Sequence, residues 1–147
     1  MPSSILFVCL GNICRSPLAE GIARSIAAKE GLDVVIDSCG TGSWHVGESP
    51  CESSVKVAEE HGVDISHQRA RQIDSDDLDW FELIIALDDK NLYDLKDMGG
   101  VNVKKLGDYG YNGEDVPDPY FFPGYEGFDK VFEMIESCVT DLLTDKS

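Results

Sequence analysis

The sequence predicts one α/β domain built on a four-stranded, mainly parallel sheet flanked by helices. Three observations predict this class. Short β-branched and apolar runs alternate along the chain with stretches of helical periodicity, which is the pattern of parallel strands joined by crossover helices. The chain has 147 residues, a length that suits one domain. No internal repeat, linker or low-complexity tract divides it, so we expect residues 1–147 to form a single domain.

The first half of the chain supplies two strands and two helices. Ile5–Cys9 is β-branched and apolar throughout, as expected for a strand buried on both faces. From Arg15 the pattern becomes helical, and Gly31 is the expected stop. Val34–Ile36 then indicates a second strand, and Glu52–Glu60 a second helix.

The second half continues the alternation. Glu82–Leu87 predicts a third buried strand, Lys90–Met98 a helix and Val101–Leu106 a fourth strand. A long loop rich in glycine and proline follows over Gly107–Gly127. Apolar residues at helical spacing over Phe128–Leu143 predict the last helix.

The charge is strongly acidic and unevenly distributed. With 28 Asp and Glu against 12 Lys and Arg, the net charge is −16, which argues against nucleic acid and anionic membrane surfaces as partners. Residues 1–30 carry a net charge of +1, so the remaining 117 residues carry −17. No apolar stretch approaches the roughly 18 residues of a membrane span.

The cysteines indicate thiols in a reducing cytoplasm, and no metal site. They are odd in number, widely spaced and not preceded by a secretory signal. Four residues separate the first two, and no second Cys/His pair completes a zinc site. The acidic run Asp74–Asp79 lacks the glycine and glutamate of a calcium loop, so we interpret it as a solvated helix start. The five cysteines are Cys9, Cys14, Cys39, Cys51 and Cys138.

The segment CLGNICRS, residues 9–16, lies between the first predicted strand and the first helix. A loop that leads into a helix aims several unpaired N–H groups at one point, and this arrangement favours an anion of phosphate size. Gly11 and Asn12 can adopt the positive φ that such a loop needs. Cys9 would place its sulfur beneath the anion as a nucleophilic thiolate. Arg15 would bind two phosphoryl oxygens in a fork.

A cysteine followed by five residues and an arginine also arises by chance, and most such pairs are a buried thiol and a surface arginine. The strand before this segment, the Gly-Asn pair inside it and the Ser-Pro helix start after it favour the functional interpretation. The other phosphate-binding loops, G-x-x-x-x-G-K-[ST] and G-x-G-x-x-G after a strand, are absent from the sequence.

The string VCLGNICRSPLAEG, Val8–Gly21, resembles the active-site signature of the low-molecular-weight protein tyrosine phosphatases. The resemblance continues in the family's order through Trp44–Gly47, Ser66–His67, Ala86–Asp88 and Val116–Tyr120. It implies a cytoplasmic enzyme that hydrolyses phosphotyrosine in protein substrates through a cysteinyl phosphate, without metal or cofactor. We expect a monomer or weak dimer.

The resemblance also implies roles for single residues. Asp118, held between Pro117 and Pro119, would protonate the leaving group as a general acid. Trp44 and Tyr120 would form an aromatic rim that grips a phenyl ring. The remaining substrate- and phosphate-binding positions would be Leu10, Gly11, Asn12, Ile13, Cys14 and Ser16.

Two further positions would support the loop, and Cys14 would have a second, redox role. Ser38 and His67 match the serine and histidine that hold the loop asparagine, here Asn12, in the family. Cys14 matches a redox position that could form a reversible disulfide with Cys9 on oxidation. Taken alone, each has a simpler interpretation: His67 would be a surface residue of a turn, and Cys14 an inert small hydrophobe.

Two alternatives use the same fold. Thiol-linked arsenate reduction would need further cysteines that relay a disulfide, normally a close downstream pair, and none is evident in the sequence. A catalytically silent phosphotyrosine-binding or anion-binding module would lack catalytic groups, whereas every matched catalytic position here is filled. The family's Asp-x-Arg after the Trp-x-x-Gly element is replaced by Cys51-Glu52-Ser53, which leaves the conformation of that loop open.

Overall fold

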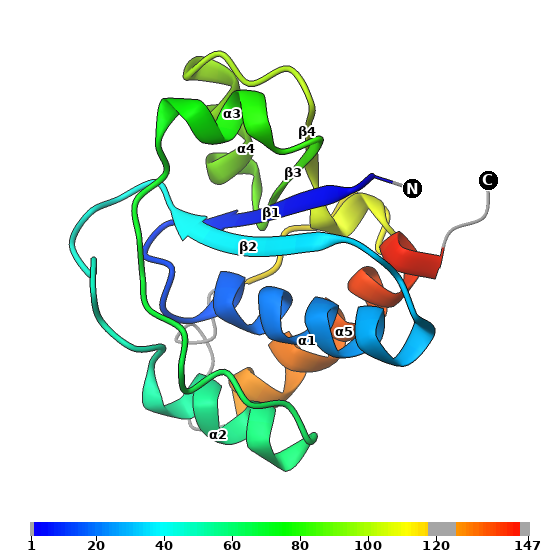
Figure 1. Cartoon of the computed structure of the whole chain (residues 1–147). Helices are drawn as coiled ribbons and strands as arrows, with labels where there is room; N and C mark the ends of the chain where they lie inside the picture. Colours follow the sequence, from blue (N-terminus) through cyan, green and yellow to red (C-terminus); the bar gives the residue numbers. More distant parts are fainter. Residues whose placement is uncertain (1, 118–125, 145–147) are drawn as a thin grey trace.

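The computed structural model describes residues 2–117 and 126–144. Within them, four parallel strands form one sheet in the order β2-β1-β3-β4, as the sequence predicts (Figure 1). The strands β1 and β2 both end on the left of Figure 1, where the chain leaves the sheet toward α1 and toward the segment 41–51. The strands are β1 (Ser4–Cys9), β2 (Val35–Gly40), β3 (Leu83–Ala86) and β4 (Val103–Lys105).

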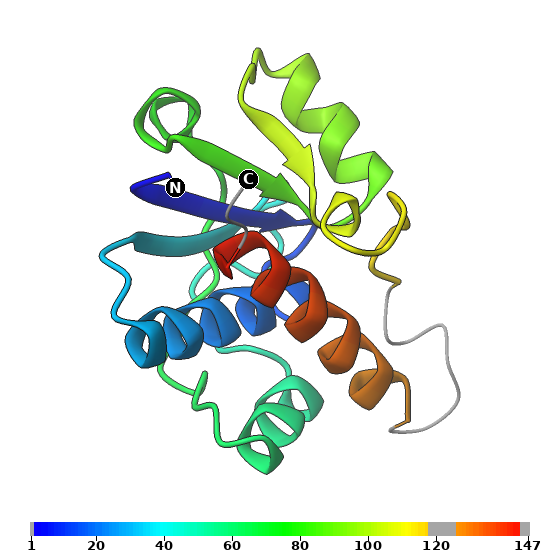
Figure 2. The ribbon, with the colours of Figure 1, turned by 90° about the vertical axis from the view of Figure 1, so that its right-hand side faces the viewer.

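Helices cover both faces of this sheet. In Figures 1 and 2, α1, α2 and α5 lie on one side of it, and α3 and α4 lie on the other. None of the helices in the described part of the chain is long and apolar enough to cross a membrane. The helices are α1 (Arg15–Glu30), α2 (Glu52–Glu60), α3 (Ser75–Trp80), α4 (Asp89–Asp97), α5 (Glu126–Thr144) and the short 3-10 helix η1 (Leu106–Asp108).

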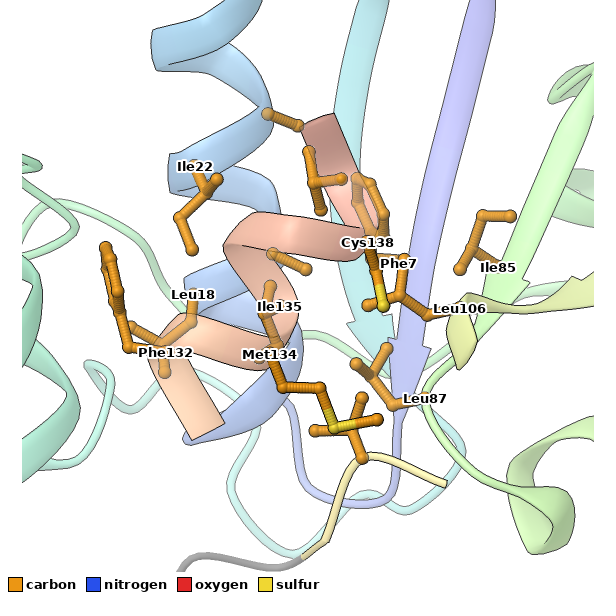
Figure 3. Close-up of a cluster of buried hydrophobic side chains, with 14 of the residues drawn as sticks. Phe7, Leu18, Ile22, Ile85, Leu87, Leu106, Phe132, Met134, Ile135 and Cys138 are labelled. Carbon is orange, nitrogen blue, oxygen red and sulfur yellow. The ribbon is translucent and has the colours of Figure 1, made fainter. Parts of the chain in front are cut away.

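The side chains of β1 alternate between two cores, because successive residues of a strand point to opposite faces. Ile5 and Phe7 belong to the larger core against α1 and α5, and Figure 3 draws Phe7 in one cluster with side chains of both helices. Leu6 and Val8 belong to the smaller core on the α3 and α4 side. Cys9, the last residue of β1, therefore emerges on the α1 side with a fixed position.

Most predicted elements agree with the structure to within about three residues, and the differences have physical causes. The strand β2 continues to Gly40, four residues beyond the predicted end at Ile36, and it includes the polar Asp37 and Ser38. The acidic run does start a helix: the side chain of Asp74 accepts from the backbone N–H of Asp76 and caps α3. Within the predicted loop, the turn η1 was not foreseen.

Candidate active site

The shape of the loop between β1 and α1 is set by its own backbone conformation and by the end of the neighbouring strand β2. Asn12 adopts φ 57°, in the left-handed region that few residues other than glycine enter. Gly11 stays outside that region, so only one of the two expected positive φ values occurs. Gly40, at the end of β2, packs directly on the loop: a Cβ there would lie 2.6 Å from the carbonyl oxygen of Leu10.

The sulfur of Cys9 lies at the floor of this loop, and the residue is only 3% exposed. The backbone N–H of Asn12 donates to it across 3.3 Å, and Ser16 Oγ lies 3.0 Å away. Ser16 Oγ also accepts from Asn12 Nδ2 at 2.7 Å, and its hydroxyl hydrogen can point either to the sulfur or to the carbonyl oxygen of Cys39 at 3.5 Å. Both contacts can therefore donate to sulfur, and donors stabilise a thiolate over a thiol.

A buried polar network fixes the strained Asn12. Its Nδ2 donates to Ser38 Oγ at 3.0 Å, and its Oδ1 accepts from the backbone N–H of Arg71 at 3.1 Å. Ser38 Oγ donates in turn to Glu20 Oε1 at 2.6 Å. Glu20, on α1, is 5% exposed and its second oxygen accepts from Arg24 Nε at 2.9 Å. This network ties the loop to α1, to β2 and to the segment before α3.

The expectation that His67 supports Asn12 is wrong. His67 is exposed and lies beside a separate surface pocket, while the contacts of Asn12 come from other residues, among them Arg71. The next residue, Gln68, points inward instead: it is 8% exposed and its Nε2 donates to the carbonyl oxygen of Pro17 at 3.1 Å. Because neighbouring side chains of this turn point in opposite directions, a difference of one position separates a surface residue from a buried one.

Arg15, the first residue of α1, is fixed from two directions. Its Nη1 lies 2.7 Å from Asp88 Oδ2 and 2.9 Å from the carbonyl oxygen of Val116. Asp88 follows β3 and caps α4, where its other oxygen accepts from the backbone N–H of Asn91. These contacts orient a guanidinium that also lines the cavity above Cys9.

The chain that leads to Asp118 is anchored close to Arg15. The backbone N–H of Val116 donates to the carbonyl oxygen of Leu87 at 2.9 Å, just beyond β3. Asp115 Oδ1 accepts from Lys105 Nζ at 2.9 Å. Asp118 and Tyr120 themselves lie outside the described residues, and the roles expected for them stay predictions.

A cavity of about 240 Å³ opens directly above the loop. Asn12 and Ser16, which the sequence predicted as phosphate-binding positions, are buried and are not among the residues that line it. Trp44 stands at the opening with 72% of its surface exposed, and its ring packs where Gly42 has no side chain. His45, which the sequence did not indicate, joins the wall. The lining residues are Cys9, Leu10, Gly11, Ile13, Cys14, Arg15, Trp44 and His45.

Cys14 borders the cavity, but the partner that the structure brings to its sulfur is Cys51. The two sulfurs lie 2.8 Å apart. The disulfide between Cys14 and Cys9 therefore stays a prediction. Cys39 and Cys138 are fully buried away from the cavity, and burial raises the pKa of the Cys138 thiol to about 11. Burial also raises the pKa of Cys39, so neither thiol is suited to be a nucleophile at neutral pH.

A buried cysteine sulfur that accepts from a loop N–H, with a guanidinium held beside the same cavity, is typical of proteins that bind phosphate esters through a cysteine-containing loop. The family model described as low molecular weight phosphotyrosine protein phosphatase matches residues 4–146. The chain belongs to this family.

Individual relatives agree with the family match along nearly the whole chain. The low molecular weight protein-tyrosine-phosphatase YfkJ of Bacillus subtilis is 42% identical over 148 residues, 95% of this chain and 93% of the relative. The low molecular weight phosphotyrosine protein phosphatase of Sus scrofa is 37% identical over 146 residues, 92% of this chain and 89% of the relative.

Solved structures show the same fold. The crystal structure of YfkJ superimposes with a TM-score of 0.87 and covers 95% of this chain and 91% of its own. A protein tyrosine phosphatase from Entamoeba histolytica, 33% identical, superimposes with a TM-score of 0.89 and covers 95% and 94%.

Proposed function

We propose that this protein hydrolyses phosphotyrosine and other aryl phosphate monoesters. One observation carries the proposal: Cys9 Sγ lies at the floor of the cavity within reach of the Asn12 N–H and the Ser16 hydroxyl, and Arg15 lines the same cavity. This arrangement supplies a nucleophile, a cradle for a dianion and a cation for the transition state in one loop.

In the first step the Cys9 thiolate attacks phosphorus in line with the leaving oxygen. The new P–S bond forms as the P–O bond to the phenolate breaks, and Asp118 donates a proton to that oxygen. Arg15 and the loop N–H groups bind the three equatorial oxygens, whose negative charge is spread in the transition state.

In the second step water hydrolyses the cysteinyl phosphate. Asp118, now ionised, accepts a proton from this water as the P–O bond forms and the P–S bond breaks. The departing sulfur becomes a thiolate again, and the hydroxyl of Ser16, 3.0 Å from it, is placed to stabilise that charge. The Asn12 N–H supports the same charge.

The opening of the cavity favours an aromatic ester. The exposed Trp44 offers a flat apolar face beside the loop, and Tyr120 is expected to complete the rim. A slot deep enough to hold a phenyl ring would favour phosphotyrosine, since the shorter phosphoserine would leave its phosphate above the loop. The relatives named protein-tyrosine phosphatases support protein substrates. We further propose a monomer or weak dimer that acts in the cytoplasm.

Turnover of para-nitrophenyl phosphate and of a phosphotyrosine peptide, each with and without a chelator, tests the proposal. Wild type should hydrolyse both with or without chelator, and Cys9→Ser should have no measurable turnover. Cys138→Ser is the matched control: it also replaces a buried thiol, but one on α5 away from the cavity, and it should keep wild-type kcat. Full turnover by Cys9→Ser, or turnover that chelation abolishes, would contradict the assignment.

A further inference from the structure

We propose that Cys14 and Cys51 form a reversible disulfide that joins the phosphate-binding loop to the start of α2. Their sulfurs lie 2.8 Å apart in the structure, although the two residues are 37 positions apart in the sequence. This disulfide is distinct from the expected one between Cys14 and Cys9. It does not depend on which phosphate ester the enzyme hydrolyses.

The backbone around the two thiols already holds them together. Cys14 immediately precedes α1 and Cys51 immediately precedes α2. The backbone N–H of Cys51 donates to the carbonyl oxygen of Ile13 at 2.8 Å. Ser54 Oγ donates to the carbonyl oxygen of Cys14 at 3.2 Å and lies 3.1 Å from Cys51 Sγ. The disulfide therefore joins two segments that are already in contact, and neither segment has to move far.

Cys14 and Cys51 are more accessible to a dissolved oxidant than the buried thiols Cys39 and Cys138. Cys14 and Cys51 are each partly exposed, and Cys14 borders the open cavity, so a small oxidant can reach it. Cys39 and Cys138 are fully buried, and burial raises the pKa of both thiols. A thiol that is buried and protonated exchanges slowly.

The chemistry is thiol–disulfide exchange with a small disulfide such as oxidised glutathione. The Cys14 thiolate attacks one sulfur of glutathione disulfide, forms a mixed disulfide and releases one glutathione thiolate. The Cys51 thiolate then attacks Cys14 Sγ and releases the second. Two protein thiols are oxidised to one disulfide, and one glutathione disulfide is reduced to two molecules of glutathione.

The disulfide between Cys14 and Cys51 affects which disulfides the nucleophile Cys9 can form. A sulfur atom takes part in one disulfide at a time, so Cys14 bonded to Cys51 cannot bond to Cys9. Cys9 keeps its own donors, the Asn12 N–H and the Ser16 hydroxyl, whatever the state of that pair. Oxidation of Cys14 and Cys51 thus removes Cys14 as a disulfide partner for Cys9.

The test is disulfide mapping on the full-length wild type in buffers with graded ratios of reduced to oxidised glutathione. Remaining thiols are blocked with N-ethylmaleimide before digestion with trypsin and Glu-C. Cleavage after Glu48 and Glu52 separates Cys51 from Cys39, and fragment ions between Cys9 and Cys14 identify the other partner. We expect a cross-linked peptide that joins Cys14 to Cys51 and disappears on reduction.

Two variants sharpen the result. Cys51→Ser should abolish this peptide, while Cys138→Ser should form it as wild type does. After oxidation, wild type should keep its phosphatase activity, whereas Cys51→Ser should lose activity that dithiothreitol restores. The proposal is wrong if Cys51 in wild type stays alkylated across the whole oxidising range, or if Cys14 is found bonded to Cys9 or glutathione instead. Because the mapping needs wild type alone, poor folding of a variant does not change its outcome.

Discussion

Arg15 Nη1 lies 2.7 Å from Asp88 Oδ2, and the same nitrogen lies 2.9 Å from the carbonyl oxygen of Val116. One guanidinium thus connects the loop after β1, the loop after β3 and the segment that leads to Asp118. The proposed anion clamp and the segment that leads to the proposed general acid share an anchor, so a change at Asp88 should affect both.

Replacing Asp88 by Asn keeps the shape of the side chain and removes its charge. We expect kcat for aryl phosphates to fall by about 10- to 100-fold. A displacement of about 1 Å in a group that positions the substrate, here the Arg15 guanidinium, can lower the rate by on the order of 100-fold. Asp94→Asn is the control, because its carboxylate forms only a loose pair with exposed Lys90 at 3.6 Å. Equal kcat values for the two variants would show that the Asp88 charge does not position Arg15.

Lys105 holds the segment before Asp118 through ion pairs to Asp89 at 2.7 Å and Asp115 at 2.9 Å, although it is itself buried. Lys105→Met should lower kcat, because Asp115 keeps only the hydrogen bond from the backbone N–H of Asp89 and two carboxylates lose their shared cation. Lys104→Met, at the exposed neighbouring position, should leave kcat unchanged. A normal kcat in Lys105→Met would show that this anchor does not matter for catalysis.

The stability difference between wild type and Lys105→Met should also depend on pH. Burial alone would lower the pKa of Lys105, but the hydrogen bonds and charges of Asp89 and Asp115 outweigh it and raise the pKa above its usual value. A group with a raised pKa contributes its full stabilisation at pH values below its ordinary pKa, about 10.4 for lysine. This stabilisation is lost only as the pH rises through the pKa of the group in the folded protein. Urea unfolding should therefore show a constant difference from neutral pH up to about that value and a smaller one above it. A difference that already shrinks near neutral pH would contradict the raised pKa.

Asn12 and Asn112 form a matched pair, because both adopt a positive φ, 57° and 54°, and only Asn12 is buried in a polar network. Glycine accepts this backbone conformation, so Asn12→Gly removes the side-chain hydrogen bonds without forcing the loop to change. We expect a loss of about 1–3 kcal/mol in the free energy of unfolding, together with a lower kcat. Asn112→Gly should change neither, and urea titration of both variants measures the difference.

The acidic surface should influence the choice of substrate. With a net charge of −16, and with Glu48 paired to His45 beside the cavity, anionic ligands meet repulsion at long range. Phosphotyrosine peptides with flanking lysines should show a higher kcat/KM than those with flanking aspartates. The ratio should grow as salt is lowered, because the Debye length rises from about 8 Å at physiological ionic strength to about 30 Å at 0.01 M. Equal values at low salt would remove this inference and leave the catalytic assignment intact.

The sequence predicted the parts of the site that are local. Three adjacent patterns predicted β1, the loop and α1: a buried apolar run, then glycine and asparagine, then a helical pattern. All three lie within a short stretch of sequence. The strand β2 was predicted too short because Asp37 and Ser38 are polar. In the structure, Ser38 serves the network of Asn12, and Asp37 accepts from Arg71 at 3.2 Å.

The parts that the sequence did not reveal are contacts between distant segments. Asp88 stands 73 residues from Arg15, and the sequence indicated it only as part of the segment Ala86–Asp88 that resembles the family. The error at His67 has another origin: a turn does not reveal from sequence which of two adjacent residues points inward, and Gln68 is the buried one. Cys51 contacts Cys14 because α2 packs beside the loop, which no local pattern predicts.

In the proposed mechanism, Cys9 carries the phosphoryl group between the two steps. The most direct measurement is a denaturant quench of Asp118→Ala reacting with an aryl phosphate that has a very good leaving group, followed by mass spectrometry of the protein. This ester needs no general acid in the first step, whereas the second step lacks its base, so the intermediate should accumulate. We expect a burst of one phenolate per chain and one phosphoryl group on the tryptic peptide that ends at Arg15, located on Cys9. Steady turnover without a burst, or a phosphoryl group found on another residue, would contradict it.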